Sequence, residues 1–173
     1  MIPAPDPSTG YLPFTSEIPI PASLEDICER FVTNARRAHL WEVFGLWLHA
    51  LDEAQLPGAL RLGGSFITAK PEPGDVDVAV AVPQGSASGA WGIVISHPHL
   101  WTWQHVGLLR DGVAGPDWRY LAARIQPALG RVDSHYFEVE TAIAVAFARD
   151  WTSEYTDDGT PTGVRKGWLE VSR

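Results

Sequence analysis

The sequence predicts an α/β (α+β) fold in which helices flank a small mixed β-sheet. Hydrophobic patterns typical of helices and of strands follow one another along the chain, in the order helices, strand, strand, helices, strand, helix. The chain has 173 residues, of which 45% are hydrophobic and 20% are charged. This length and composition are typical of one soluble domain with its own core.

The N-terminal part of the chain predicts an extended arm followed by two helices. Residues 1–22 are rich in proline and lack periodicity, which indicates an arm on the surface, so that residues 23–173 form a single domain. Ser23 and Asp26 have the spacing of a capping box at the start of the first helix. The second helix is expected over 36–54, where apolar residues recur at intervals of three and four: Leu40, Val43, Phe44, Trp47, Leu48 and Leu51.

The rest of the chain predicts strands and helices in alternation. A short apolar run covers 59–62, and alternating apolar residues predict a strand over 76–82. Residues 83–90 carry no side chain large enough to pack and predict a flexible loop, whereas 91–96 fits either a strand or the start of a helix. We expect the remaining elements in this order: helices over 97–112 and 116–129, a strand over 131–140, a helix over 141–151, and a short strand or ordered tail over 162–171.

Composition limits the expected partners and compartment. The formal net charge is −8, so no broad nucleic-acid-binding surface is expected, and Arg36–Arg37 and Arg165–Lys166 are the nearest candidates for a basic patch. Cys28 is the only cysteine, which excludes an intramolecular disulfide and suits a reducing compartment. Neither a signal-peptide pattern nor an apolar run of ~18 residues occurs, so we expect a cytoplasmic protein with no membrane partner.

Two aspartates stand on one face of the strand expected at 76–82. Side chains alternate along a strand, so Asp75 and Asp77 point to the face opposite Val76 and Val78. Like charges this close repel, and a cation between them removes the repulsion. Mg²⁺ prefers oxygen ligands and commonly binds through one or two carboxylates together with a substrate phosphate. The pair therefore predicts a metal site.

A glycine-rich turn precedes the aspartates. Gly63 and Gly64 follow the short strand, and backbone amides without side chains can approach an anion closely. Ser65 adds a hydroxyl, and Thr68 and Lys70 follow within reach of a phosphate. The turn therefore predicts a phosphate-binding segment next to the metal site.

These two features together resemble the signature of the polymerase-beta-type nucleotidyltransferase superfamily. The matching residues are Leu62-Gly63-Gly64-Ser65, nine intervening residues, and Asp75-Val76-Asp77-Val78. The wider chain resembles an uncharacterised small bacterial family within that superfamily. That second resemblance rests on Gly10-Tyr11-Leu12-Pro13, on Gly64-Ser65-Phe66 with Thr68, Lys70 and Pro73, and on Lys166-Gly167.

The resemblance implies a nucleotidyltransferase-like fold and a two-magnesium site. It implies that Gly63, Gly64 and Ser65 hold a nucleoside triphosphate, and that Asp75 and Asp77 bind two Mg²⁺ ions. It also implies a third carboxylate on a later strand. Asp133 is the best candidate, and its alternative role is that of a turn acceptor at the strand end. His135 shares a face with Asp133 and is expected either to contact the nucleotide or to fill space beside the site.

Two hypotheses for function follow. The first is a metal-dependent nucleotidyltransferase that moves a nucleoside monophosphate from a triphosphate onto the hydroxyl of a protein, an RNA or a small molecule. For small bacterial enzymes, the resemblance implies a toxin–antitoxin or phage-defence setting. Little chain remains for an acceptor-binding domain, so a protein partner or a homodimer is expected to complete the cleft. The second is a non-catalytic nucleotide-binding or protein-interaction module that retains the fold.

Overall fold

The protein folds around a five-stranded mixed β-sheet. The computed structural model describes residues 1–102, 130–156 and 158–171. The sheet has the strand order β1-β7-β2-β3-β4. These strands span β1 Ile20–Pro21, β7 Leu169–Val171, β2 Ala59–Leu62, β3 Val76–Val82 and β4 Val132–Glu138. β1–β7 and β3–β4 are parallel pairs, and β2 is antiparallel to both β7 and β3.

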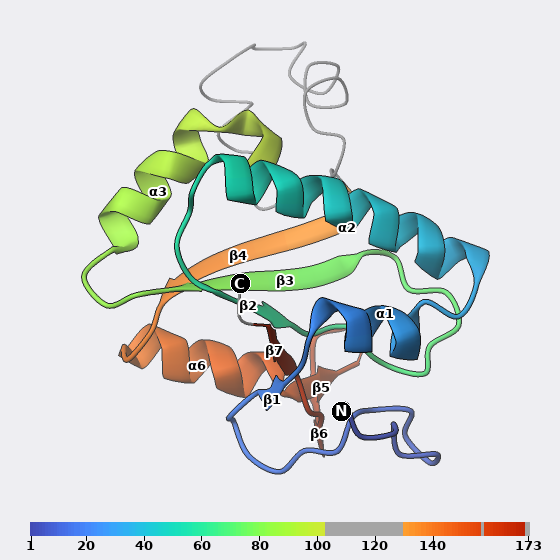
Figure 1. Ribbon diagram of the computed structural model, residues 1–173. Helices are drawn as coiled ribbons and strands as arrows, with labels where there is room; N and C mark the ends of the chain where they lie inside the picture. The colour runs from blue at the N-terminus through green and yellow to red at the C-terminus, as the bar shows by residue number, and fades with distance from the viewer. Residues whose placement is uncertain (103–129, 157, 172–173) are drawn as a thin grey trace.

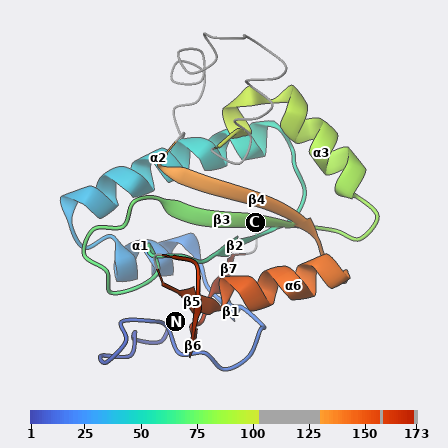
Figure 2. The ribbon, with the colours of Figure 1, turned by 180° about the vertical axis from the view of Figure 1, so that it is seen from behind.

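Helices cover both faces of this sheet. α2 (Ala35–Glu53) and α3 (Ala87–Ser96) lie on one side, and α6 (Ala142–Trp151) lies on the other, as both views show (Figures 1 and 2). α1 (Leu24–Phe31) precedes α2, a 3₁₀ turn follows α3 at Pro98–Leu100, and a hairpin of β5 (Ser153–Tyr155) and β6 (Pro161–Arg165) follows α6. The predicted mixed α/β class, with a small mixed sheet flanked by helices, is confirmed.

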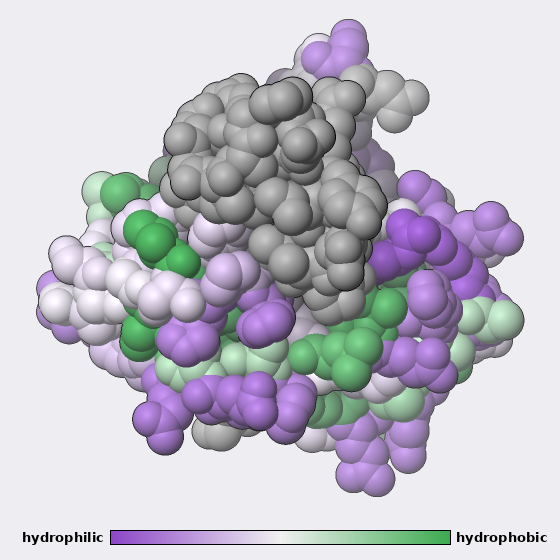
Figure 3. Space-filling model, turned by 90° about the horizontal axis from the view of Figure 1, so that it is seen from above, coloured by the Kyte–Doolittle hydropathy of each residue, from purple (hydrophilic) through white to green (hydrophobic). Residues whose placement is uncertain are grey.

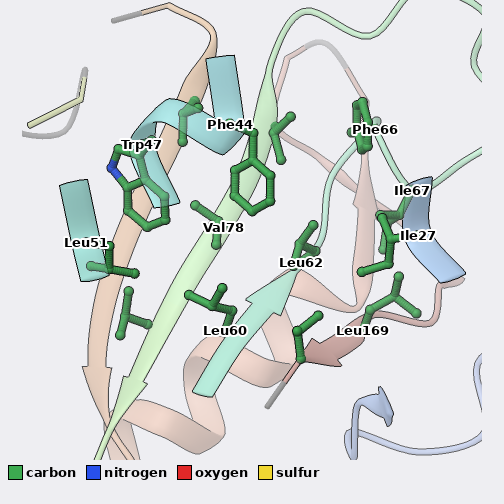
Figure 4. Close-up of a cluster of buried hydrophobic side chains, with 14 of the residues drawn as sticks. Ile27, Phe44, Trp47, Leu51, Leu60, Leu62, Phe66, Ile67, Val78 and Leu169 are labelled. Carbon is green, nitrogen blue, oxygen red and sulfur yellow. The ribbon is translucent and has the colours of Figure 1, made fainter. Parts of the chain in front are cut away.

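Side-chain caps stabilise the N-termini of the first two helices. The predicted capping box is confirmed, because the Ser23 hydroxyl accepts the Asp26 amide and the Asp26 carboxylate accepts the Ser23 amide. Asn34 caps α2 by accepting the Arg37 amide. The periodic apolar residues of α2 then face the sheet, and Figure 4 shows Phe44, Trp47 and Leu51 packed over Leu60 and Val78. Leu48 alone of the predicted set is only half-buried.

Other predicted elements need correction or are decided by the structure. The expected loop over 83–90 ends early, since α3 begins at Ala87, and of the two alternatives for 91–96 the helix is confirmed. Gly89 and Gly92 are unfavourable in a helix interior, but Ala90 and Val94, one turn apart, are both buried and pack this helix against the core. The expected tail over 162–171 forms two separate strands, β6 and β7. The helix expected over 97–112 is not α-helical where it is described, since only a 3₁₀ turn forms at Pro98–Leu100. Its remainder from residue 103 and the helix expected over 116–129 lie outside the described residues.

The two faces of the sheet differ in chemistry. Val76, Val78 and Val80 of β3 belong to the large core beneath α1 and α2. Ala79 and Ala81, which point the other way, pack with Phe137 of β4 in a smaller cluster against α6. Asp77 has the same parity as Ala79 and Ala81, so it lies on the α6 face at the start of β3. Strand periodicity thus places the predicted acidic site beside the C-terminal end of α6.

The N-terminal segment contributes to the core. Ile2 and Leu12 are 2% and 1% exposed. The Leu12 carbonyl accepts the Gly167 amide, the Glu17 carbonyl accepts the Trp168 indole N–H, and β1 adds an edge strand beside β7. Residues 1–22 therefore carry buried anchors, and the division into an arm and a domain stays a prediction.

We expect Leu12→Ala to lower the free energy of unfolding by ~2–4 kcal/mol, because it removes a fully buried side chain. Ile18 belongs to the same segment but is 75% exposed, so Ile18→Ala is the matched control and is expected to change stability by less than ~0.5 kcal/mol. Urea denaturation of both variants measures this difference. Equal effects would show that the segment does not anchor the fold.

The outer face of α2 and α3 is mixed in polarity. Figure 3 shows hydrophobic patches there among polar residues, and Leu46, Trp91 and Ile95 are exposed large hydrophobic side chains on these two helices. They lie outside the core cluster and so contribute little to its burial. Among the described residues, we find no helix that combines the length and apolarity needed to cross a bilayer.

Candidate functional site

Three aspartates gather at the start of two parallel strands. Asp77 of β3 and Asp133 of β4 are register partners, so their side chains leave the sheet side by side on the α6 face. Asp75 precedes β3 by one residue. Burial, Asp75 and Asp133 together raise the pKa of Asp77 to about 6, against partial opposition from Lys166 and His135. Burial and Asp133 likewise raise the pKa of Asp75. The three carboxylates are therefore electrostatically coupled.

The glycine turn lies directly against this cluster. The Gly63 amide donates to the Asp77 carbonyl at 3.1 Å. Gly64 has a φ of +64°, and a Cβ there would stand 1.6 Å from Asp77 Oδ2. A Cβ on Gly63 would stand 2.5 Å from the Trp151 ring of α6. Glycine is therefore required at both positions, because the backbone lies too close to other groups for a side chain. At Gly64 that group is the acidic cluster, and at Gly63 it is the end of α6.

Gly64→Ala is expected to lower the free energy of unfolding by ~1–3 kcal/mol more than Gly85→Ala does. Gly85 is a matched control because its φ is +79° and a Cβ there meets nothing within 4 Å. The control therefore carries the backbone strain without the overlap with Asp77. Thermal and urea unfolding measure the difference, and equal losses would mean that Gly64 can move away from Asp77 freely.

The start of α2 holds the loop between the glycine turn and β3. The Arg37 guanidinium, which is 2% exposed, donates to the carbonyls of Phe31, Phe66, Thr68 and Lys70 at 2.6–3.0 Å. Arg36 donates to the carbonyls of Pro73 and Gly74. The sequence offered Arg36–Arg37 as a candidate basic patch. In the structure, these two arginines position this loop.

A polar pocket of about 560 Å³ opens beside the glycine turn. Four of the predicted nucleotide-binding residues line it, namely Gly64, Ser65, Thr68 and Lys70. Gly63 is buried and does not line the pocket. The Thr68 hydroxyl donates to the Ser65 carbonyl and accepts the Lys70 amide, so it shapes the loop. The opposite wall comes from distant segments: Thr9, Gly10, Tyr11, Glu154, Tyr155 and Lys166.

His135 lies beside Asp133, as strand periodicity predicted. Its Nε2 is 3.4 Å from Asp133 Oδ2, and its ring lies edge-on to Trp151 at 5.6 Å. Ser134 points to the opposite face, where it is buried and contacts Thr102. The histidine is therefore a direct neighbour of Asp133 on the α6 face.

The structure thus brings the predicted residues into two adjoining groups. Asp75, Asp77, Asp133 and His135 form an acidic cluster, and the glycine turn separates it from the polar pocket. Carboxylate oxygens are ligands that Mg²⁺ prefers, so the chemistry of the donor set fits that ion. As the side chains stand, no group of at least three His, Cys, Asp or Glu within the described ranges is spaced to hold a metal ion.

In the sequence, Lys166 stands next to Arg165 in the second candidate basic pair. In the structure the two side chains separate. Arg165 pairs with Glu17 and stacks on Phe14, whereas Lys166 lines the pocket and lies 6.0 Å from the centre of the Tyr11 ring. The Lys166-Gly167 pair in the resembled pattern was the available signal, and the contact with Tyr11 was not visible in the sequence.

Comparison with known proteins gives a family assignment. No match was found among curated proteins, and none among solved structures. The sequence profile of DUF6932, described as a family of unknown function, matches residues 4–172. Because that match covers nearly the whole chain, the protein belongs to the DUF6932 family.

Proposed function

We propose that this protein is a metal-dependent nucleotidyltransferase with a nucleotidyltransferase-like fold. It would move a nucleoside monophosphate from a nucleoside triphosphate onto an acceptor hydroxyl. The relative position of the aspartates and the glycine turn carries the proposal. Asp77 and Asp133 are register partners on adjacent parallel strands. The backbone of the turn at Gly64 lies directly against the Asp77 carboxylate. This arrangement sets an acidic cluster next to a pocket lined by amides, hydroxyls and two lysines.

Mg²⁺ would be held by Asp75, Asp77 and Asp133. Two such ions would neutralise charge on the triphosphate and on the attacking and leaving oxygens. Support comes from the hard oxygen donors and from the mutual repulsion of the carboxylates, which a cation relieves. Ser65 and the turn amides would hold the leaving pyrophosphate, because backbone N–H groups in a turn form an anion-binding concavity.

Asp133 would accept the proton of the acceptor hydroxyl. The acceptor oxygen forms a bond to the α-phosphorus while the bond from that phosphorus to pyrophosphate breaks. The proton released from the hydroxyl moves to Asp133 and then to His135, whose Nε2 is 3.4 Å away and whose side chain is 30% exposed to solvent. His135 therefore provides a route by which the proton leaves the site.

The test is a transfer assay with each nucleoside triphosphate labelled at the α-phosphate. The protein is incubated with Mg²⁺, alone and with cell extract, and compared with Asp77→Asn and Asp133→Asn. Glu53→Gln is the charge-matched control, because Glu53 is 70% exposed at the end of α2 and pairs with His49. Label transfer that is lost in both aspartate variants and retained in the control supports the proposal.

Two results would contradict it. If label transfer persists in Asp77→Asn, the acidic cluster does not take part in the reaction. If the protein binds nucleotide saturably but transfers no label with any triphosphate or extract, the result supports a non-catalytic nucleotide-binding module instead of an enzyme.

A further inference from the structure

Both lysines of the chain line the same pocket. The sequence contains two lysines, Lys70 and Lys166, in a chain of net charge −8. Lys70 lies on the loop after the glycine turn and Lys166 follows β6, and both line the 560 Å³ pocket beside Gly64 and Ser65. Two like charges that share one pocket repel each other, and an anion bound between them relieves that repulsion.

The two lysines face different carboxylates. Lys70 is within electrostatic range of Asp75, and Lys166 is within range of Asp77 and of Glu154. Both lysines line the pocket, and each is also close enough to the acidic cluster to lower the pKa of one of its aspartates. A polyphosphate carries several charges along its chain, so it offers more oxygens to the two ammonium groups than a carboxylate or a monophosphate does. Lysine, with three donors on a flexible stem, suits phosphate oxygens.

Glu154 is the negative group inside the pocket. It accepts hydrogen bonds from the hydroxyls of Tyr11 and Thr162. Those bonds, together with a smaller contribution from Lys166, lower the pKa of Glu154 and keep it ionised. Glu154 lies within electrostatic range of Lys166, and it would repel any anionic ligand that entered beside it.

We propose that Lys70 and Lys166 together bind one polyphosphate chain in this pocket, and that Glu154, on the same lining, opposes this binding. The inference rests on the proposed function in one respect: the chain would be the triphosphate tail of the nucleotide. Residues 9–11 of the N-terminal segment wall the pocket, so the site requires that segment. The Gly10 carbonyl accepts the Ala69 amide and thereby attaches this wall to the loop that carries Lys70.

The test is calorimetric titration of the full chain with inorganic tripolyphosphate in excess Mg²⁺. Lys70→Met and Lys166→Met are each expected to weaken binding by at least about tenfold, because each removes a charge-assisted contact. Glu154→Gln is expected to tighten binding several-fold, and Lys166→Arg to retain most of it. Arg149→Met is the control, since Arg149 is an exposed cation of α6 outside the pocket and its loss is expected to leave binding unchanged.

Competition identifies the source of the phosphates. Tripolyphosphate should compete with ATP, and orthophosphate and AMP should bind much more weakly than either. Unchanged binding in Lys166→Met, weaker binding in Glu154→Gln, or tripolyphosphate that does not compete with ATP would each overturn the inference. Circular dichroism of every variant, with Lys166→Arg as the rescue, separates lost binding from lost folding.

Failure of this inference and failure of the proposed function are distinguishable. If tripolyphosphate binds through the lysines but no label is transferred to any acceptor, the polyphosphate site is supported and the proposed enzyme activity is contradicted. If label transfer depends on Asp77 but on neither lysine, the proposed enzyme activity is supported and the polyphosphate site is contradicted.

Discussion

Asp77→Asn is expected to stabilise the metal-free protein at pH 7 by ~1–2 kcal/mol while it lowers nucleotide transfer by at least ~10²-fold. The stabilising effect follows from the cost of the charge. Burial, Asp75 and Asp133 disfavour the ionised form of Asp77, and the neutral amide of asparagine has no such cost. The loss of transfer follows because the amide cannot replace an anionic metal ligand.

The pH dependence has a definite sign. The pKa of Asp77 rises from an ordinary value of 3.8 to about 6 on folding, so the folded state holds the proton more tightly than the unfolded state. Between about pH 4 and pH 6 the unfolded chain releases this proton first, and the stability of the wild-type protein therefore falls as pH rises through that window. Asp77→Asn lacks this loss, so the two stability curves should converge near pH 4 and diverge towards pH 7.

Urea denaturation in the presence of a chelator, at several pH values across this window, measures both curves. Glu53→Gln is the control, because it removes one exposed charge outside the cluster and should follow the wild-type curve. A variant curve that lies below the wild-type curve at pH 7 would show that the Asp77 carboxylate stabilises the fold instead of straining it.

Arg37→Ala is expected to lower the free energy of unfolding by ~3–5 kcal/mol, because it leaves several buried carbonyls without a donor. The four carbonyls belong to Phe31, Phe66, Thr68 and Lys70, so the variant should also release the loop that carries Lys70. Arg37→Lys keeps the charge but lacks the planar fork of donors, and it should recover only part of the stability.

Arg36→Ala is the matched control for Arg37. It removes a neighbouring arginine that bonds the Pro73 and Gly74 carbonyls from a less buried position, and we expect a loss of ~1 kcal/mol. Urea denaturation compares the three variants, and hydrogen exchange of the 66–70 amides reports on the loop. Equal losses in Arg36→Ala and Arg37→Ala, or full recovery in Arg37→Lys, would mean that the buried guanidinium does not hold the loop.

Short-range periodicity explains what was predictable. The helical repeat of α2 and the alternation in β3 each depend on residues a few positions apart, so both elements could be placed before the structure was known. The same alternation correctly put Asp133 and His135 on one face of their strand and Ser134 on the other. By contrast, the start of α3 was missed because its first residues are small and carry no periodic signal.

Local pattern therefore specified the faces of the strands, and the packing of distant segments specified their neighbours. Asp77 and Asp133 meet because β3 and β4 pair in parallel with this register, and a parallel pairing follows from a long crossover that no local pattern encodes. Lys166 reaches the pocket, and Arg37 reaches the loop, only because the chain brings residues far apart in sequence together. A side chain's direction depends on the backbone of its own element, whereas its partners depend on how whole elements pack.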